Sequence, residues 1–323
     1  MTTIEGIVPV APTAFTDGEE LDLEGQQRIV DFLVDAEVDG ICILANYSEQ
    51  FSLTDEERHQ VLTATLERAA DRLPICVTTS HYSTKIAARR CRQAQELGAS
   101  LVMLMPPFFG ASMKVDEQGV VEYFKRVADG LEIPVMIQDA PMSTTPMTVD
   151  LMARIAREVP QVQYAKIEVP RTADKLRGLA EIAGQDLPGL FDGEEAVTLI
   201  PDFDAGARGT MTSSMIPDVL GTAARAHLRG DRAHAVEIWE EMLPLIQFEN
   251  RQCGLLATKV LMKEGGILSS ERTRAPFPAI HPTTRRQLVE LAQRKDAFIL
   301  RWAGERTGRT HIPNTTAAAG GSA

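Results

Sequence analysis

The chain has only four cysteines in 323 residues, and none of them lies in a CxxC pair. They are Cys42, Cys76, Cys91 and Cys253. This scattered spacing indicates neither a zinc site nor a disulfide framework. Because Cys42 and Cys76 fall in apolar, strand-like runs, we expect them to be buried thiols of the core.

Positive charge is scarce as well, since 33 lysines and arginines stand against 45 acidic residues and the net charge is -12. Phosphate contact needs a basic face, so the composition argues against nucleic acid as a partner. An anionic small molecule needs only a small local positive field and stays compatible with this charge. The histidines form no cluster with metal-ligand spacing, and we predict neither a metal nor another cofactor.

Long apolar runs are also missing. No uninterrupted stretch approaches the length that spans a membrane. Residues 1–5 show no basic region followed by an apolar one, as a signal peptide would. We therefore expect a cytoplasmic protein without a membrane partner.

What the chain does contain is a regular alternation of short apolar runs and longer amphipathic runs. The apolar runs are strand candidates at Gly6–Pro12, Gly40–Ala45, Ile75–Thr79, Leu101–Met105, Val135–Gln138, Val162–Lys166, Gly189–Phe191 and Gly209–Met211. The amphipathic runs are helix candidates at Leu23–Ala36, Asp55–Ala70, Thr84–Leu97, Glu117–Leu131, Thr148–Glu158 and Asp174–Ala183. Thr54 and Glu57 have the spacing of a capping box, which marks the start of a helix.

Apolar strands that are each followed by a helix predict a parallel sheet covered by helices, an α/β fold. Eight such units in about 220 residues match a (β/α)₈ barrel, the TIM barrel. A doubly wound sheet would alternate in the same way, but the chain has neither GxGxxG after the first strand nor GxxxxGK[ST]. The sequence therefore favours the barrel.

Strand signals stop after about residue 229, and the patterns that follow are helical. These patterns lie at Ala233–Asn250, Gly254–Glu264 and Thr283–Ala303. We predict a barrel catalytic domain at residues 1–228 and a small C-terminal helical extension at 229–304. Residues 305–323 are polar and rich in small side chains, which predicts a disordered tail.

Lys166 ends the sixth strand candidate, and Glu168 follows two residues later. The carboxyl ends of barrel strands are where this fold places its chemistry. A lysine desolvated there can lose its proton near neutral pH and attack a ketone to form a Schiff base. The alternative is a solvated lysine where a strand meets a loop.

Taken in order, the strand ends resemble the dihydrodipicolinate synthase and N-acetylneuraminate lyase family. The similarity covers about residues 4–303 and is carried by Pro9–Phe15, Glu49, Pro141 and Lys166. The resemblance implies a (β/α)₈ barrel, a Schiff-base lysine at Lys166, and a homodimer or homotetramer.

The chain departs from the family pattern at the proton-transfer residues. The family's tyrosine on the fifth strand falls on Gln138, and its tyrosines in the fourth loop fall on Phe108 and Phe109. Its substrate-carboxylate arginine falls near Ser143. Neither glutamine nor phenylalanine relays a proton as a phenol does. These departures argue against synthase and ordinary aldolase activity.

One branch of the family, the 2-keto-3-deoxy-L-arabonate dehydratases, is more similar to the chain. The shared strings lie at Cys42–Phe51, Val77–Thr84, Gln138–Pro141, Lys166–Glu168, Phe191–Glu195 and Glu249–Gln252. This resemblance implies a class I hydro-lyase that converts 2-keto-3-deoxy-L-arabonate to 2-oxoglutarate semialdehyde (2,5-dioxopentanoate) and water. Two alternatives stay open: a lyase or aldolase for another 2-keto-3-deoxy sugar acid, and a ligand-binding member without turnover.

Dehydration needs acid and base groups near Lys166, because a C3 proton must be removed and the C4 hydroxyl must leave as water. We expect Glu168 and Glu195 to transfer these protons, since a carboxyl in a partly apolar pocket has a raised pKa. Glu194 is a candidate for substrate binding. The alternatives are favourable charge in the first turn of a helix for Glu194 and Glu195, and a loop salt bridge for Glu168.

The other substrate-binding candidates lie at other strand ends. Ser48, with the backbone N–H groups of Asn46 and Tyr47, would hold the substrate carboxylate, unless Ser48 is only a helix cap. Tyr47 projects either into the pocket or against a neighbouring subunit. His81 either binds a substrate hydroxyl or is structural. The remaining candidates, at the fifth and eighth strand ends, are Gln138 and Ser213.

Overall fold

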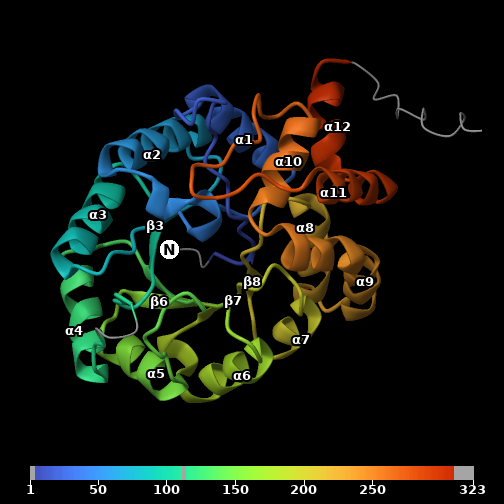
Figure 1. Cartoon of the computed structure of the whole chain (residues 1–323). Coiled ribbons are helices and arrows are strands. Elements are labelled where there is room, and N and C mark those ends of the chain that lie inside the picture. Colours follow the sequence, from blue (N-terminus) through green and yellow to red (C-terminus); the bar gives the residue numbers. More distant parts are fainter. Residues whose placement is uncertain (1–3, 111–113, 309–323) are drawn as a thin grey trace, which may run out of the picture.

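Eight short parallel strands form one sheet, and Figure 1 looks along the axis of the ring that the strands make. The structure is a computed structural model that describes residues 4–110 and 114–308. The strands are β1 (Gly6–Ile7), β2 (Ile41–Ile43), β3 (Ile75–Thr78), β4 (Leu101–Leu104), β5 (Val135–Asp139), β6 (Val162–Ile167), β7 (Gly189–Asp192) and β8 (Gly209–Thr210). Their order in the sheet is β1-β8-β7-β6-β5-β4-β3-β2, so each strand lies beside its neighbour in sequence.

The sheet closes into a ring between β1 and β2. Val10 pairs in parallel with Cys42, and the Cys42 N–H donates to the Pro9 carbonyl at 2.9 Å. The predicted first strand, Gly6–Pro12, is shorter in the structure because Pro9 has no N–H to donate to the ladder. The predicted (β/α)₈ barrel is confirmed.

A helix follows each strand and covers the outside of the ring (Figure 1). These helices are α1 (Leu23–Asp35), α2 (Asp55–Ala69), α3 (Thr84–Glu96), α4 (Glu117–Ala128), α5 (Val149–Glu158), α6 (Thr172–Ile182), α7 (Leu199–Asp204) and α8 (Pro217–Leu228). The predicted capping box of α2 is present, because Thr54 and Glu57 each bond the other's backbone N–H. Short 3₁₀ turns lie at η1 (Asn46–Ser48), η2 (Gln50–Ser52) and η3 (Gly184–Asp186).

The interior of the barrel is a packed core. It is filled by Val8, Val10, Cys42, Ala45, Cys76, Leu101, Met103, Met136, Tyr164, Phe191 and Met211. Cys42 and Cys76 are therefore buried core thiols, as predicted. Phe191 fits because its neighbour on β8 is Gly209, where a Cβ atom would lie 2.2 Å from the ring.

The chain after β8 is helical, as predicted, but with different boundaries. The additional elements are α9 (Arg232–Phe248), the π-helix η4 (Glu249–Cys253), α10 (Leu256–Glu264), α11 (Pro282–Arg294) and α12 (Phe298–Arg306). The single helix predicted at Thr283–Ala303 is two helices, because Asp296 has a left-handed φ of 48° that ends the first of them. The predicted tail begins within α12, and its residues 309–323 lie outside the described part of the chain.

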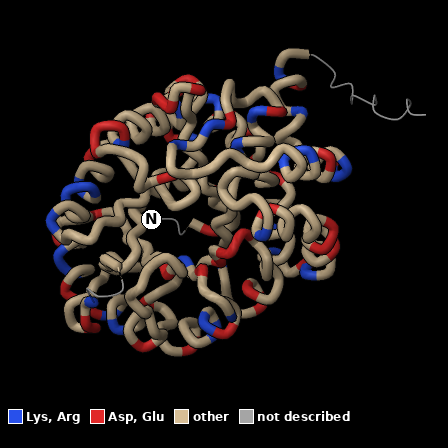
Figure 2. The backbone as a smooth tube through the Cα atoms, in the orientation of Figure 1, with Lys and Arg blue, Asp and Glu red and all other residues tan. Residues whose placement is uncertain are grey.

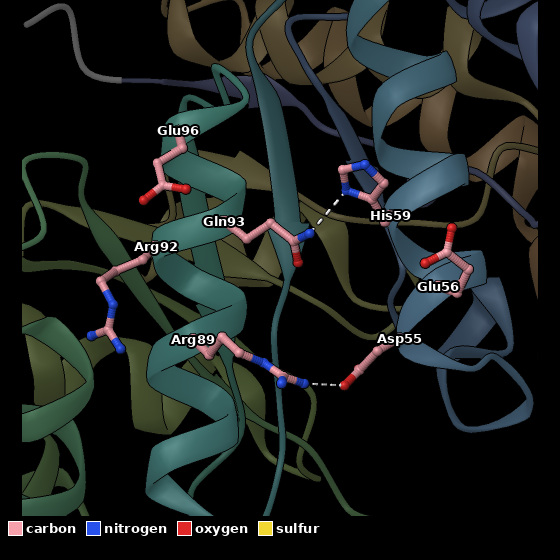
Figure 3. A pocket seen from close by; sticks show the side chains of 7 residues that line it. All are labelled: Asp55, Glu56, His59, Arg89, Arg92, Gln93 and Glu96. Atoms are coloured by element: carbon pink, nitrogen blue, oxygen red, sulfur yellow. Dashed lines mark hydrogen bonds and ion pairs between the residues drawn. The ribbon is translucent and has the colours of Figure 1, made fainter.

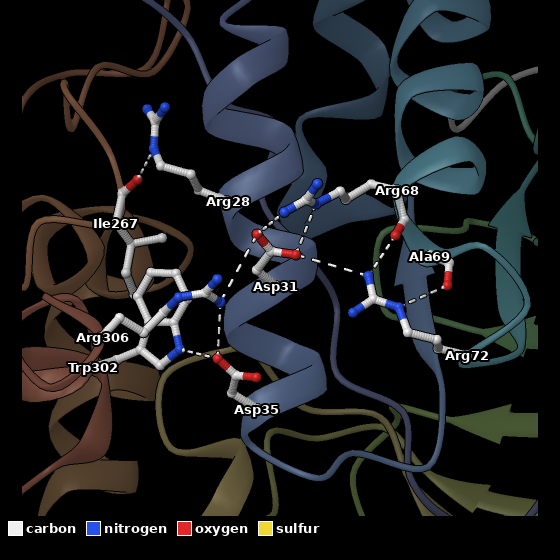
Figure 4. Close-up of polar contacts among 9 residues, drawn as sticks. All are labelled: Arg28, Asp31, Asp35, Arg68, Ala69, Arg72, Ile267, Trp302 and Arg306. Carbon is white, nitrogen blue, oxygen red and sulfur yellow. Dashed lines mark hydrogen bonds and ion pairs between the residues drawn. The ribbon is translucent and has the colours of Figure 1, made fainter.

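The helical extension packs against α1 (Figure 4). Asp35 on α1 accepts hydrogen bonds from the Trp302 indole at 2.8 Å and from Arg306 at 3.0 Å, both on α12. Arg28 on α1 donates to the Ile267 carbonyl at 2.7 Å. Acidic and basic residues are interspersed around the ring of helices in Figure 2. Within residues 4–110 and 114–308, none of the helices has the length and apolar character that crossing a bilayer requires.

Candidate active site

Lys166 lies at the carboxyl end of β6 with its side chain inside the barrel. Only 3% of the residue is exposed. The space for its side chain comes from Gly193, where a Cβ atom would lie 2.6 Å from both the Lys166 Cε and the Glu168 Cγ. The solvated loop lysine, which the sequence left open, is therefore excluded.

Glu168 and Gln138 meet Lys166 at a single carboxylate oxygen. The Lys166 Nζ lies 2.5 Å from the Glu168 Oε1, and the Gln138 amide donates to the same oxygen at 2.8 Å. Gln138 is the register partner of Lys166 on β5, which explains why the two side chains emerge together. The Gln138 carbonyl oxygen is buried and has no partner in the described residues, so it can accept a hydrogen bond from a ligand.

The charge state of Lys166 differs from the prediction. Burial alone would lower the pKa of this lysine, but the carboxylates of Glu168 and Glu195 outweigh burial and raise it. The free enzyme therefore holds an ammonium ion and not the neutral amine that we predicted from desolvation. A proton must first pass to a neighbouring group, and the Glu168 Oε1 at 2.5 Å is in position to receive it.

Glu195 reaches the same space from the loop after β7. Its backbone is left-handed, with a φ of 54°, a conformation that costs free energy in a residue other than glycine. Its Oε2 accepts the backbone N–H of Ser213 at 2.6 Å. Burial and the nearby charges of Glu249 and Glu168 raise the pKa of Glu195 well above its ordinary value, against the opposing effect of Lys166.

Glu249, on η4 of the helical extension, is a third carboxyl, and a buried one, that sequence reasoning missed. It is 2% exposed, and its Oε1 has no hydrogen-bond partner in the described residues. Burial raises its pKa to about 8, and an interaction with the Ser213 side chain partly opposes this. Its sequence signal is the string Glu249–Gln252, which supports the resemblance to the dehydratase branch but does not indicate a buried carboxyl.

Tyr47, on η1, supplies a phenol near the site, where the family's own tyrosines are replaced by Gln138, Phe108 and Phe109. It packs against the core of the barrel interior. Burial, followed by the charges of Glu195, Glu249 and Glu168, raises the pKa of its hydroxyl far above the ordinary value. Tyr47 therefore stays protonated at physiological pH and is a hydrogen-bond donor beside the carboxyls. Of the two alternatives for Tyr47, these neighbours favour projection into the pocket over packing against a neighbouring subunit.

The profile of the Dihydrodipicolinate synthetase family matches residues 3–295. The chain belongs to that family. It is 50% identical over 298 residues to the L-2-keto-3-deoxyarabonate dehydratase of Azospirillum brasilense. The aligned region covers 92% of this chain and 96% of that protein. The chain is 28% identical over 274 residues to a 4-hydroxy-tetrahydrodipicolinate synthase of Thermomicrobium roseum, covering 84% and 88%.

Solved structures of the family have the same fold. The crystal structure of the dihydrodipicolinate synthase of Rhodopseudomonas palustris matches with a TM-score of 0.81 and 26% identity, over 90% of this chain and 97% of that one. The synthase of Aquifex aeolicus matches with a TM-score of 0.85 and 24% identity, over 91% and 98%.

Glu194 lies beside the three carboxyls of this family member but is more open to solvent. Its backbone N–H donates to Asp192 at 3.0 Å. Burial and the charge of Asp192 raise its pKa, and Arg251 opposes them. Glu194 follows the end of β7 at the rim of the barrel, and its contact with substrate stays a prediction. The first-turn interpretation of Glu194 and Glu195 fails, since α7 begins only at Leu199.

Ser48 uses its own hydroxyl and N–H within the protein, so the predicted carboxylate cradle stays a prediction only for the N–H groups of Asn46 and Tyr47. The Ser48 hydroxyl donates to the Ala11 carbonyl at 2.6 Å, and its own N–H is bonded to the Ala45 carbonyl at 3.0 Å. These bonds hold η1 against the end of β1 and leave no free N–H on Ser48. Asn46 accepts a bond from the Gln50 amide at 2.6 Å. The Ser48 contacts are therefore structural ones within the segment after β2.

His81 is not brought together with Lys166. Its Nδ1 accepts the Ser83 N–H at 2.9 Å, and its carbonyl accepts the Tyr123 hydroxyl at 3.0 Å. Burial and then the charge of Arg90 lower its pKa, so the ring is neutral at physiological pH. These contacts favour the structural interpretation of His81.

Glu49, one of the residues that carried the family resemblance, makes structural contacts in this fold. It is buried and forms an ion pair with Lys259 of α10, and its Oε2 accepts the backbone N–H of Arg274 at 2.9 Å. Phe15 covers the pair, with the Lys259 Nζ 4.4 Å from its ring centroid. Glu49 therefore joins the second strand end to the helical extension and has no free oxygen for substrate.

A hollow of about 560 Å³ lies outside the barrel between α2 and α3 (Figure 3). Its walls are charged and polar, with Arg89 paired to Asp55 at 2.5 Å and Gln93 bonded to His59 at 2.9 Å. None of the residues near Lys166 lines it. The candidate site is therefore the cluster around Lys166 at the carboxyl ends of β5 to β8, which includes the partly buried Glu168 and the buried Glu195.

Proposed function

We propose that the chain is a Schiff-base-forming dehydratase that converts 2-keto-3-deoxy-L-arabonate to 2-oxoglutarate semialdehyde and water. The observation that carries the proposal is the 50% identity, over nearly the whole chain, to an L-2-keto-3-deoxyarabonate dehydratase. The contact between Lys166 and Glu168 supports it, because it joins a potential imine-forming amine to a proton acceptor. We also assign the reaction to non-phosphorylative pentose catabolism.

The first step is formation of the imine. Lys166 transfers a proton to Glu168, and the neutral amine attacks the C2 carbonyl of the substrate. Glu168 returns this proton when the C2 oxygen leaves as water. The resulting iminium draws electrons from C3 and weakens the C3–H bond. Gln138 holds the Glu168 Oε1 in place through its amide, which keeps the carboxylate close to the iminium.

The second step is elimination. Glu168, ionised again, removes a proton from C3, and Glu195, protonated because its pKa is raised, donates its proton to the C4 hydroxyl. The C4–O bond breaks, water leaves, and a double bond forms between C3 and C4. C5 then loses a proton and C3 gains one, which leaves an enol between C4 and C5. This enol tautomerises to the aldehyde by moving its hydroxyl proton to C4, and hydrolysis of the imine gives the semialdehyde. No step requires a metal or an organic cofactor.

Product analysis tests the reaction type. We expect purified protein with 2-keto-3-deoxy-L-arabonate to yield 2-oxoglutarate semialdehyde, because an acid on the C4 oxygen makes that oxygen leave as water. A coupled semialdehyde dehydrogenase detects this product, and lactate dehydrogenase detects pyruvate in the same sample. Pyruvate as the main product would assign the chain to the aldolase alternative. Absence of turnover on every 2-keto-3-deoxy acid tried would favour a ligand-binding member.

We also propose that the chain forms a homodimer or homotetramer. Large apolar side chains are exposed on the loops after four consecutive strands, namely Phe51, Tyr82, Phe109 and Met142. The rings of Tyr82 and Phe109 lie 5.6 Å apart, so they form one apolar patch that burial against a second copy would cover. Phe108, the other half of the predicted aromatic pair, is partly buried.

Light scattering at micromolar concentration should give a mass of two or four chains. Phe109→Ser should lower the measured mass, whereas Phe277→Ser, an exposed aromatic residue in the segment before α11, should leave it unchanged. A monomer mass for the unaltered chain would refute the proposal.

A further inference from the structure

Gln138 stands where the family has its fifth-strand tyrosine, and one contact fixes the orientation of its amide. The residue is fully buried in β5. Its Nε2 donates to the Glu168 Oε1 at 2.8 Å, the same oxygen that lies 2.5 Å from the Lys166 Nζ. The reverse orientation would set the amide oxygen against a carboxylate oxygen, and neither of these atoms can donate to the other. The Nε2 therefore belongs to Glu168, and the amide oxygen is left for another group.

The Gln138 Oε1 is a buried acceptor without a donor. Among residues 4–110 and 114–308, no group donates to it. A buried polar atom without a partner costs free energy, and nearly all such atoms in folded proteins have one. Gln138 and Lys166 are register partners on neighbouring strands, so this oxygen lies at the level of the amine that binds the substrate. A substrate donor is therefore the group that completes it.

The substrate offers few donors at that level. In the iminium form of 2-keto-3-deoxy-L-arabonate, the C1 carboxylate can only accept hydrogen bonds. The iminium N–H is on the Lys166 nitrogen, which faces the Glu168 Oε1. The remaining donors are the hydroxyls on C4 and C5. Of these, the C4 hydroxyl is one carbon closer to the imine and is the group that leaves.

We propose that the Gln138 Oε1 accepts a hydrogen bond from the C4 hydroxyl of the substrate, and that Gln138 thereby selects dehydration over carbon–carbon cleavage. The inference rests on the proposed function and deepens it, because it names the atom that binds the leaving group. The two ends of one amide have separate tasks: Nε2 holds the base Glu168, and Oε1 holds the hydroxyl that departs.

The choice of reaction follows from the weak basicity of an amide oxygen, which accepts a hydrogen bond but does not take the proton. In cleavage, a base removes the proton of the C4 hydroxyl, a C4 carbonyl forms, and the C3–C4 electron pair moves to the iminium. In dehydration that proton stays on the oxygen. Glu168 takes the C3 proton, the C3–H electron pair forms the C3–C4 double bond, and the C4–O pair leaves with the oxygen. The proton from Glu195 completes the water.

The first test compares two ligands that differ in the position of one hydroxyl. Both 4-hydroxy-2-oxopentanoate and 5-hydroxy-2-oxopentanoate can form an imine with Lys166, but only the first has a C4 hydroxyl. The measurement is the concentration of each that gives half of the maximal borohydride adduct, by mass spectrometry, in protein carrying Glu195→Gln so that elimination is slow. Adding Gln138→Leu should weaken the 4-hydroxy compound roughly tenfold more than the 5-hydroxy compound. Any effect of the lost contact with Glu168 is common to both ligands and cancels in this ratio.

The second test places a base at the same position. Gln138→Glu keeps the size of the side chain but replaces the amide by a carboxyl group that can take a proton. With 2-keto-3-deoxy-L-arabonate, this variant should release pyruvate and glycolaldehyde, with a pyruvate share roughly tenfold above that of the unaltered protein. Lactate dehydrogenase measures the pyruvate, and a semialdehyde dehydrogenase measures the dehydration product in the same sample.

Gln163→Leu is the matched control, since Gln163 is an exposed residue of β6 whose amide donates to the Pro160 carbonyl at 3.4 Å. It should change neither the ligand ratio nor the products. An equal loss of both ligands in Gln138→Leu would reduce Gln138 to a support for Glu168 and overturn the proposal. An unchanged pyruvate share in Gln138→Glu would refute its control of the reaction type. Pyruvate as the main product of the unaltered protein would instead refute the proposed dehydration, whatever the ligand ratio is.

Discussion

Lys166→Arg should reduce turnover of 2-keto-3-deoxy-L-arabonate to the background rate. A guanidinium stays protonated in proteins and cannot form an imine. In the unaltered protein, borohydride and substrate should add one reduced adduct to the peptide that carries Lys166, as mass spectrometry will show. The Arg variant keeps a positive charge beside Glu168, so its fold should be preserved.

The matched control is Lys125→Arg, a partly exposed lysine on α4 that pairs with Glu158 at 2.7 Å. It should retain full turnover and the adduct. Lys259 is the other deeply buried lysine among the described residues that an adduct could identify, but its ion pair with Glu49 keeps it engaged. An adduct on Lys259, or turnover in Lys166→Arg, would contradict the assignment.

Glu168→Gln and Glu195→Gln should each lower turnover on the order of 10²-fold or more, the usual size of a general acid–base contribution. Both substitutions keep the shape of the side chain and remove its proton exchange. Glu168→Gln also removes the charge nearest to Lys166, which lowers the pKa of the lysine and lets the amine lose its proton without transfer to Glu168. Glu195→Gln leaves Glu168 in place, so the borohydride adduct should still form in both variants. Stopped turnover with continued trapping is the signature of lost proton transfer.

Glu122→Gln on the outer face of α4 is the control, since its carboxylate contacts only Lys125, at 3.6 Å, among the salt bridges of the described residues. It should behave like the unaltered protein. Near-normal turnover in both Glu168→Gln and Glu195→Gln would show that these carboxyls are structural, and loss of the adduct in either would assign that residue to imine formation.

The fold was predictable because periodicity reports which side chains are buried. Every predicted strand is found, and Lys166 stands at the strand end where the sequence placed it. What periodicity does not report is a local break in a helix. The run Thr283–Ala303 contains neither proline nor glycine, so nothing in its pattern indicates that Asp296 adopts a left-handed conformation.

The site was predictable only in part, because charge states and hydrogen-bond partners depend on distances in space. Lys166 is charged since Glu168 and Glu195 lie nearby, and burial alone predicted the opposite. The Ser48 hydroxyl donates a hydrogen bond to the Ala11 carbonyl, which lies 37 positions away in the sequence. Glu249 was missed because a glutamate within a helical pattern usually faces solvent. Its burial follows from the packing of the extension, which no local pattern encodes.

The ion pair between Glu49 and Lys259 limits how this chain can be divided. The barrel supplies the carboxylate and α10 supplies its counter-charge, so a barrel ending at residue 228 would retain a buried Glu49 without a partner. Breaking a buried pair in this way typically costs about 3–5 kcal/mol. The same cut would remove Glu249 from the reacting groups. We therefore expect the barrel and its helical extension to unfold together as one unit.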